Sequence, residues 1–417
     1  MRCLYYNICS RRIGFGLPRE LWVVQAGFFL NYLGCGAVMP FEVIYLHEGR
    51  RLSLGAGGLV VGVVSGLAVV AAPVSGPIID RMGARATAAG AGVALAAGYG
   101  GLAFAHTPTQ ALAAAAVAGI GNGALIPSQS TLLAAVVRPE LRHRATAVSR
   151  VAANLGVGLG AVLGGQVAAQ GVDGFVVLYV GNAVTYLAYV AVLVVAVREA
   201  PRPEPLRGGY RLVLRDRAFV HLALTNVAVI AIGWGFFTWV VPVYAREQLG
   251  AGTGLIGLLG MANAAAVTVA QIPVARLAEG RRRTVTMAIA SLAFVPACAL
   301  VLATGFVSLG AASVALVLAA VVVGIAECFH TTVLTPLVAD LAPAALRGRY
   351  MAAMGLSWWL GLAIAPTLGA QAVSAAPSAT LVAAAAISLL AAVSALALEP
   401  ALPPAIRSTP RPEAVAG

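Results

Sequence analysis

The residues best able to do chemistry are Glu327 and His330, two titratable side chains three positions apart in a long apolar stretch. Residues three apart share one face of a helix, so the carboxyl group and the imidazole could share a proton. A charge at the centre of a bilayer costs about 3 kcal/mol or more on insertion scales, and such groups face a cavity or a bundle interior. We therefore expect Glu327 and His330 to bind and release protons. The structural alternative is a neutral Glu327 that hydrogen-bonds a neighbouring helix.

Five other side chains stand near the middle of further apolar stretches, where they could contact a small molecule: Asn31, Tyr32, Asn122, Trp234 and Trp358. The aromatic rings would offer apolar faces, and the asparagines would offer both donors and acceptors. The alternative for each asparagine is a hydrogen bond that joins two helices.

Several other polar residues lie toward the ends of their apolar stretches. Glu42 is about nine residues beyond the centre of its stretch, or roughly 13 Å at helical rise, so we expect water to reach it. Trp239 is expected to anchor its helix at a membrane surface. Asp340 and Asp173 are expected to be solvated.

Some kinds of chemistry are excluded by composition. The chain contains no lysine, so it has neither a phosphate loop of the Walker A type nor a lysine Schiff base. Glu327 and His330 have the spacing of metal ligands, but the second such helix of a di-metal bundle is missing. No nucleophile stands with a base, so we expect no enzyme, no metal site and no cofactor.

The elements that must position these residues are long apolar helices. Of the 417 residues, 60% are apolar and only 10% are charged, which leaves no room for a sizeable soluble domain. A bilayer core of about 30 Å needs roughly 20 helical residues. The sequence predicts an all-α membrane protein with twelve transmembrane helices, at about 21–45, 56–79, 86–105, 111–137, 145–169, 175–197, 219–244, 254–277, 284–303, 313–337, 350–373 and 378–398.

Arginines are distributed unevenly between the two sides of this arrangement. If both termini are cytoplasmic, all of the 27 arginines lie on that side except Arg50, Arg51 and Arg246. The positive-inside rule thus supports the span count and a multi-pass location in the plasma or inner membrane. The net charge of +12 could suggest nucleic acid, but the arginines occupy short loops, where anionic lipid headgroups explain them better.

The chain divides into two similar halves. A shift of 205 residues places Gly119-Ile120 on Gly324-Ile325 and the loop arginines Arg142 and Arg144 on Arg347 and Arg349. An internal repeat of six spans per half is typical of transporters whose halves rock against each other. We expect pseudo-symmetric six-helix bundles over 1–197 and 218–398, a cytoplasmic middle loop over 198–217 and a cytoplasmic tail over 399–417.

The loop after the second span reads Gly76-Pro77-Ile78-Ile79-Asp80-Arg81-Met82-Gly83-Ala84-Arg85. This spacing, in a chain of twelve spans and two halves, resembles the signature loop of the major facilitator superfamily (MFS). Within that superfamily, the chain is similar to the 12-span drug–proton antiporters. The resemblance implies that Gly76, Asp80, Arg81, Gly83 and Arg85 form an inner gate against the other half. A degenerate counterpart runs over 276–283. The resemblance also implies that spans 1, 4, 7 and 10 line a central cavity.

Two further motifs of drug-efflux subfamilies are incomplete. Ala115 stands where those subfamilies have an arginine in span 4, and Ala161 stands where they have a proline in span 5. Gly156, Gly160 and Gly164 in span 5 recur every four residues, a spacing typical of close helix packing.

We expect a secondary active transporter that exports small, partly hydrophobic compounds in exchange for protons, as in drug resistance. Its partners would be the small-molecule substrate, protons and membrane lipid, without nucleic acid, and the protein would be a monomer. One alternative is a proton-coupled uptake symporter for a sugar, nucleoside or organic acid. A remote alternative is a multispan receptor without transport activity.

Overall fold

The computed structural model describes residues 12–13, 17–136, 142–197, 211–343 and 346–409, apart from some side chains near helix ends. Within these residues, twelve helical segments of 18 to 33 residues are long and apolar enough to cross a membrane. The predicted all-α fold with twelve transmembrane helices is therefore confirmed. A short antiparallel pair of strands, β1 (Arg12–Ile13) and β2 (Leu17–Pro18), precedes the first helix.

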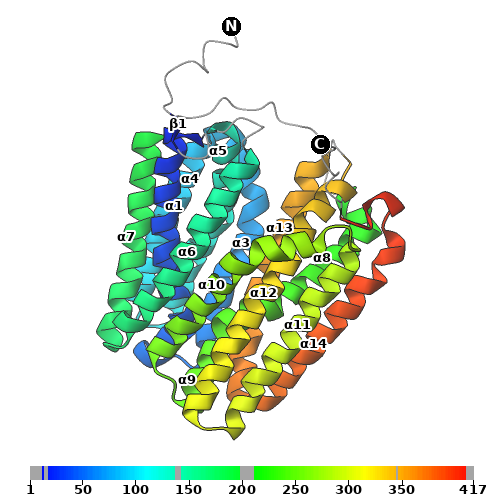
Figure 1. The fold of residues 1–417 in the computed structure, drawn as a ribbon. Helices are drawn as coiled ribbons and strands as arrows, with labels where there is room; N and C mark the ends of the chain where they lie inside the picture. The colour runs from blue at the N-terminus through cyan, green and yellow to red at the C-terminus, as the bar shows by residue number, and fades with distance from the viewer. Residues whose placement is uncertain (1–11, 14–16, 137–141, 198–210, 344–345, 410–417) are drawn as a thin grey trace.

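Six spans lie within Trp22–Ala196 and six within Arg217–Ala401, and they form the two groups of helices drawn in Figure 1. The elements of the N-terminal half are α1 (Arg19–Val38), η1 (Met39–Phe41), α2 (Glu42–Ile44), η2 (Tyr45–Gly49), α3 (Leu54–Met82), α4 (Ala84–Ala103), α5 (Pro108–Val136), α6 (Arg142–Ala168) and α7 (Val172–Ala196). Those of the C-terminal half are η4 (Val213–Arg215), α8 (Arg217–Ile230), η5 (Ala231–Val240), α9 (Val241–Leu249), α10 (Thr253–Ala278), α11 (Arg283–Ala303), η6 (Thr304–Phe306), α12 (Leu309–Leu341), α13 (Arg347–Ala375), α14 (Pro377–Ala397), η8 (Glu399–Ala401) and η9 (Pro404–Ile406).

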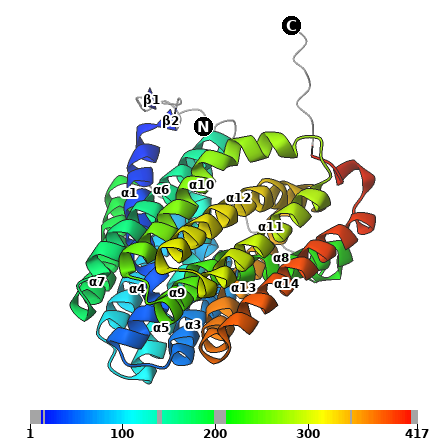
Figure 2. The same ribbon diagram turned by 60° about the horizontal axis from the view of Figure 1, so that its bottom comes forward.

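The two halves stand side by side and meet along two helix pairs, α3 with α13 and α6 with α10 (Figures 1 and 2). The start of α1 and the end of α14 lie at the same end of the bundle, which we call the termini side; the opposite end is the far side. Figure 1 shows the halves diverging toward the termini side.

Small residues set the distances between helices within each half. The glycine stripe of α6 packs on α1, where an added Cβ at Gly160 or Gly164 would collide with the carbonyl oxygens of Leu33 and Ala37. In the C-terminal half, a Cβ at Gly361 would lie 2.8 Å from the carbonyl oxygen of Val227. The stripe predicted to pack closely therefore does so, as in other helix pairs that associate through small residues.

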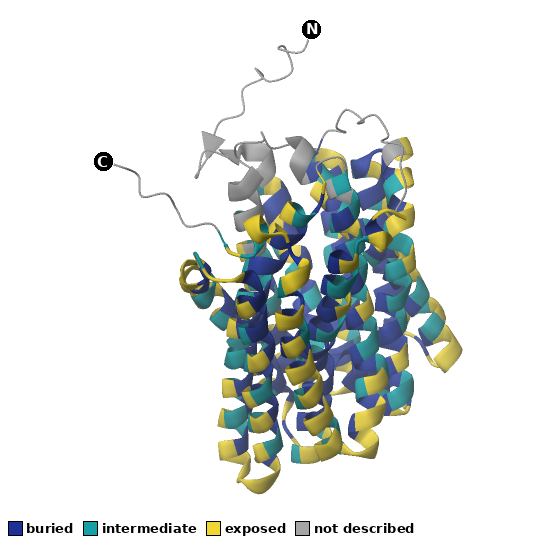
Figure 3. Ribbon diagram, turned by 90° about the vertical axis from the view of Figure 1, so that its right-hand side faces the viewer, coloured by how far each residue is buried: buried dark blue, intermediate teal, exposed yellow. Residues whose placement is uncertain are grey.

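The outer surface of the bundle is apolar. Exposed residues face outward along the helices (Figure 3), and large apolar side chains on that surface include Val195 (86% exposed) and Val269 (75% exposed). A soluble monomer rarely exposes so many large apolar side chains. Such a surface suits lipid contact, and with twelve apolar spans it makes the chain a multi-pass membrane protein.

Two spans are not continuous α-helices. Span 1 passes through a 3₁₀ turn at η1, beside Pro40, and ends in the wider π turns of η2. Span 7 contains ten residues of π-helix at η5, followed by Pro242 at the start of α9. A proline removes one backbone donor, and π turns rotate the side chains that follow. These irregular segments reach each other across the interface between the halves.

Candidate functional site

A cavity of about 350 Å³ lies between the two halves and is lined by both. The N-terminal half contributes residues from α1, η1 and α2 through α7, and the C-terminal half contributes residues from η5, α9, α10, α12 and α13. Six of the side chains singled out from the sequence line this cavity: Asn31, Tyr32, Asn122, Trp234, Trp358 and Glu327. The arrangement can hold a small molecule between an aromatic wall and a few polar groups.

Glu327 is the acidic group of the C-terminal half within this cavity. Its side chain is held by Asn263 of α10, whose Nδ2 donates to Oε1 at 3.2 Å. Glu327 is only 6% exposed, and no salt bridge to it is found within the described residues. A buried carboxyl group with an amide partner and no cation is stable mainly in its neutral form. No pattern in the sequence points to Asn263, because its proximity to Glu327 depends on the packing of two spans distant in the chain.

His330 lies behind the cavity wall. It is fully buried, and its Nε2 is 2.9 Å from Oδ1 of Asn226 on α8, which in turn donates to Ser357 at 2.7 Å. Its ring stands edge-on to Trp234, with centroids 6.5 Å apart. The expected sharing of a proton with Glu327 is not seen, since each side chain hydrogen-bonds a different asparagine from a different helix.

Aromatic rings form the C-terminal wall of the cavity. Trp234 of η5 and Trp358 of α13 pack with centroids 4.7 Å apart at an interplanar angle of 58°. Trp359 and Phe237 line the same wall. Rings in this arrangement offer apolar contact and can attract a cation to their faces.

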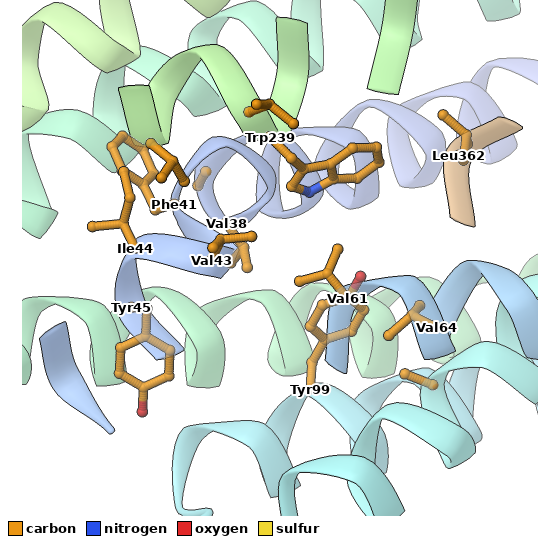
Figure 4. Packing of buried hydrophobic residues seen from close by; sticks show 14 of the residues in the cluster. Val38, Phe41, Val43, Ile44, Tyr45, Val61, Val64, Tyr99, Trp239 and Leu362 are labelled. Atoms are coloured by element: carbon orange, nitrogen blue, oxygen red, sulfur yellow. The ribbon is translucent and has the colours of Figure 1, made fainter. Parts of the chain in front are cut away.

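Glu42 and Trp239 differ from expectation. Glu42 is buried, 5% exposed, and lines the cavity rather than meeting water at the membrane surface. Trp239, expected to anchor its helix at that surface, is 6% exposed and donates from Nε1 to Oε2 of Glu42 at 2.8 Å. Figure 4 shows Trp239 across from Tyr99 and Val61 of the N-terminal half. The irregular turns of η1 and η5 cause the difference, because a straight helix would place these side chains elsewhere.

The halves are joined on the far side by an ion pair. Arg246 at the end of span 7 donates to both carboxylate oxygens of Glu48 at the end of span 1, at 2.6 and 3.1 Å. Nε2 of His47 lies 4.0 Å from Oε1 of Glu247. Nearby, a Cβ added to Gly55 of α3 would lie 2.7 Å from Cγ of Gln371 on α13.

Toward the termini side, Gly66 and Gly76 of the same helix face open space. Side chains of the two halves thus meet on the far side, whereas Figure 1 shows the helices of the halves diverging on the side of the termini.

The signature loop lies on the termini side. Gly83 ends α3 with φ of 93°, a conformation that favours glycine, and its N–H donates to the Ile79 carbonyl at 2.8 Å. Arg85 donates to the carbonyl of Val197 at 3.0 Å, a contact within the N-terminal half. Arg81 is exposed, Gly76 faces open space, and the side chain of Asp80 lies outside the described residues.

The counterpart loop of the C-terminal half is held by an ion pair. Arg283 is 2% exposed and donates to Asp340 at 2.6 Å, while the Asp340 side chain remains 44% exposed, in accord with the expected solvation. The residues after α14 also pack along this loop. Arg283 donates its N–H to the Arg407 carbonyl at 2.8 Å, and Thr409 donates its N–H to the Arg281 carbonyl at 3.0 Å.

Comparison with known proteins places this architecture in a family. The family model described as Major Facilitator Superfamily matches residues 26–252 and 223–416. Among similar proteins, the multidrug resistance protein MdtH of Cronobacter sakazakii is 30% identical over 82% of this chain and 84% of its own length. MdtH of Aeromonas salmonicida is 24% identical over 84% of this chain and 85% of its own length. An uncharacterized MFS-type transporter of Bacillus subtilis, YttB, is 26% identical over 61% of this chain, and the match spans only 64% of that relative.

Solved structures share the fold at low identity. A POT family transporter in complex with 5-aminolevulinic acid superposes with a TM-score of 0.78 at 14% identity, over 94% of this chain and 98% of the other. A D-xylose–proton symporter superposes with a TM-score of 0.75 at 17% identity, over 93% and 98% of the two chains. The family-model match and the MdtH relatives show that this chain belongs to the Major Facilitator Superfamily, a family of multi-pass membrane transporters.

Proposed function

We propose that this transporter exports small, partly hydrophobic compounds in exchange for protons. The observation that carries the proposal is Glu327, a buried carboxyl group that lines the cavity beside Trp234 and Trp358 with Asn263 as its polar partner. A proton or a cationic group of the cargo can neutralise Glu327, and competition between the two would couple their movements. Two relatives that bear the name multidrug resistance protein support export.

The cavity also indicates the class of cargo. Its wall is rich in tryptophan, and no arginine is among its described lining residues, so phosphates and other anions lack a partner there. A small amphipathic compound fits this lining, with its ring or alkyl part against Trp234 and Trp358. Asn31, Tyr32 and Asn122 offer polar contacts from the N-terminal half.

Membrane location, oligomeric state and gating belong to the same proposal. The transporter would lie in the plasma or inner membrane as a monomer, with its termini side in the cytoplasm, in accord with the arginine distribution. The loop with Asp80, Arg81 and Arg85 would close the termini side when the halves rock. His330, bonded to Asn226, would hold the helix that carries Glu327 rather than bind the proton itself.

Proteoliposomes test this proposal directly. A fluorescent lipophilic cation serves as the probe, and an imposed pH gradient drives its accumulation against concentration. We expect Glu327→Gln to abolish gradient-driven accumulation while probe exchange without a gradient continues, because the amide cannot gain or lose a proton. Asp173→Asn, at an exposed carboxylate on the far side, is the matched control. Undiminished gradient-driven accumulation by the Glu327→Gln protein would refute the coupling role. If the unmodified protein moves the probe only in the same direction as the protons, the protein is an uptake symporter.

A further inference from the structure

A second carboxyl group lines the same cavity and has no part in the proposal above. Among the described lining residues, the acidic ones are Glu327 from the C-terminal half and Glu42 from the N-terminal half. Glu42 lies in α2, the short segment between the irregular turns of span 1. Of the two carboxyl groups, Glu42 is the one toward the far side, where the ion pair between Arg246 and Glu48 joins the halves.

The neighbours of Glu42 do not compensate a negative charge. The titratable groups that interact with it are Cys35 from α1, Tyr99 from α4, and Tyr179 and Tyr186 from α7. Farther out, Arg246 pairs with Glu48, and Nε2 of His47 lies 4.0 Å from Oε1 of Glu247. Arg50 donates to the Tyr45 hydroxyl and lies over the ring of that tyrosine. Within the described residues, Glu42 thus has two neutral hydrogen-bond donors, Trp239 from the C-terminal half and Tyr99 from its own half, and no ion pair.

The burial of Glu42 depends on the closure of the far side. Trp239 belongs to η5 of the C-terminal half, and α2 also packs on α9 of that half. Separation of the halves on the far side would remove this cover and admit water to the carboxyl group. Burial of an ionised carboxylate without a cation costs more free energy than burial of the neutral acid. Far-side closure and protonation of Glu42 must therefore favour each other, because the coupling is reciprocal.

We propose that Glu42 is a second proton-binding residue of this transporter, which takes its proton while the far side is open and whose protonation favours far-side closure. Trp239 is the positioning residue: it caps the carboxyl group only when the halves meet. The inference rests on the proposed alternation of the cavity between two sides. It adds a proton site in the N-terminal half to the one at Glu327.

Distances between spin labels across the far side test the proposal without cargo or gradient. His106→Cys and Ser308→Cys place one label in an exposed far-side loop of each half, in a protein whose five native cysteines are replaced by alanine. His47→Gln and Glu327→Gln are included throughout, because both side chains could also respond to pH. In this reference protein we expect the closed population to grow as pH falls. A tenfold difference in proton affinity between the two states would change the closed-to-open ratio by about tenfold.

Two variants decide the outcome. Glu42→Gln, a permanently neutral side chain, should be closed at every pH and show no pH response. Trp239→Phe removes the donor that helps to bury the ionised form, so its pH response should be larger than that of the reference protein. A pH response in Glu42→Gln equal to that of the reference protein would overturn the proposal, as would a reference protein without one. A Trp239→Phe protein with a lower closed population but an unchanged pH response would show a merely structural tryptophan. If the Glu42 proposal fails these tests, the proposed export coupled to Glu327 still stands, because it has its own test in proteoliposomes.

Discussion

Trp358 and Trp234 are the side chains on which the choice of cargo should depend most. Their rings form one wall of the cavity that Glu327 also lines. A desolvated cation on an aromatic face gains about 2 kcal/mol, and an apolar ring gains further contact area. The polar groups opposite them orient a ligand but contribute less binding free energy in a water-accessible cavity.

We expect Trp358→Leu to weaken binding of a lipophilic cation by about tenfold, since loss of one aromatic face removes roughly 1–2 kcal/mol. Equilibrium binding of the fluorescent probe to the purified protein measures this change. Trp22→Leu, on α1 and outside the cavity lining, is the control and should bind as the unmodified protein does. Equal affinities in all three proteins would place the binding site elsewhere.

At the scale of single elements, the contact between α6 and α1 determines how compact the N-terminal half can be. Gly156 and Gly160 allow the backbones to approach so closely that no side chain fits between them. Lipid gives little hydrophobic drive for helix association, so van der Waals contact of this kind provides most of the stability.

Gly160→Leu should therefore destabilise the protein by about 1–3 kcal/mol or more, because α1 and α6 must move apart. Thermal unfolding in detergent measures the loss as a lower Tm. Gly181→Leu on α7 is a matched control, since a Cβ there meets nothing within 4 Å. A similar Tm for both variants would contradict the importance of this packing.

Several elements could be predicted from the sequence, and several contacts could not. Span count and the two halves follow from patterns that repeat along the chain, namely hydropathy, arginine position and matched glycines. The burial of Glu42 and Trp239 could not be predicted, because an argument from a straight helix cannot locate 3₁₀ and π turns. Asn263 and Asn226 were missed for another reason: which spans lie beside Glu327 and His330 is decided by tertiary packing.

At the scale of the whole molecule, the two halves hold each other on the far side and part on the side of the termini. Arg246 and Glu48 join the ends of spans 7 and 1, and both side chains are about one-third exposed. An exposed ion pair of this kind contributes about 1 kcal/mol or less. This ion pair therefore contributes only modestly to closure of the far side, beside the contact of Trp239 with Glu42 and the packing of α3 on α13.

Arg246→Gln should shift the population toward an open far side by about fivefold or less, in proportion to this small free energy. Spin-label distances between positions 106 and 308 measure the shift. The exchanged pair Glu48→Arg with Arg246→Glu should restore closure, whereas failure to restore it would show that Arg246 acts through its other contact, the Ala251 carbonyl.

The direction of the molecule in the membrane is a separate prediction. A fluorescent protein that folds only in the cytoplasm should fluoresce when fused after Gly417. A reporter that is active only after export should be active when inserted at 250–252. The opposite pattern for the two reporters would invert the assignment of cytoplasmic and outer sides.

The segment after α14, residues 399–409, packs on the C-terminal half, and this packing limits how far the chain can be shortened. Glu399 contacts Thr284 and Arg282, Leu402 is almost fully buried, and Thr409 pairs with Arg281. If the chain ended directly after α14, Thr284, Arg282 and Arg281 would lose these contacts. The packing of α11 and α12 in the C-terminal half would then loosen. A shortened protein should therefore keep every residue through Thr409.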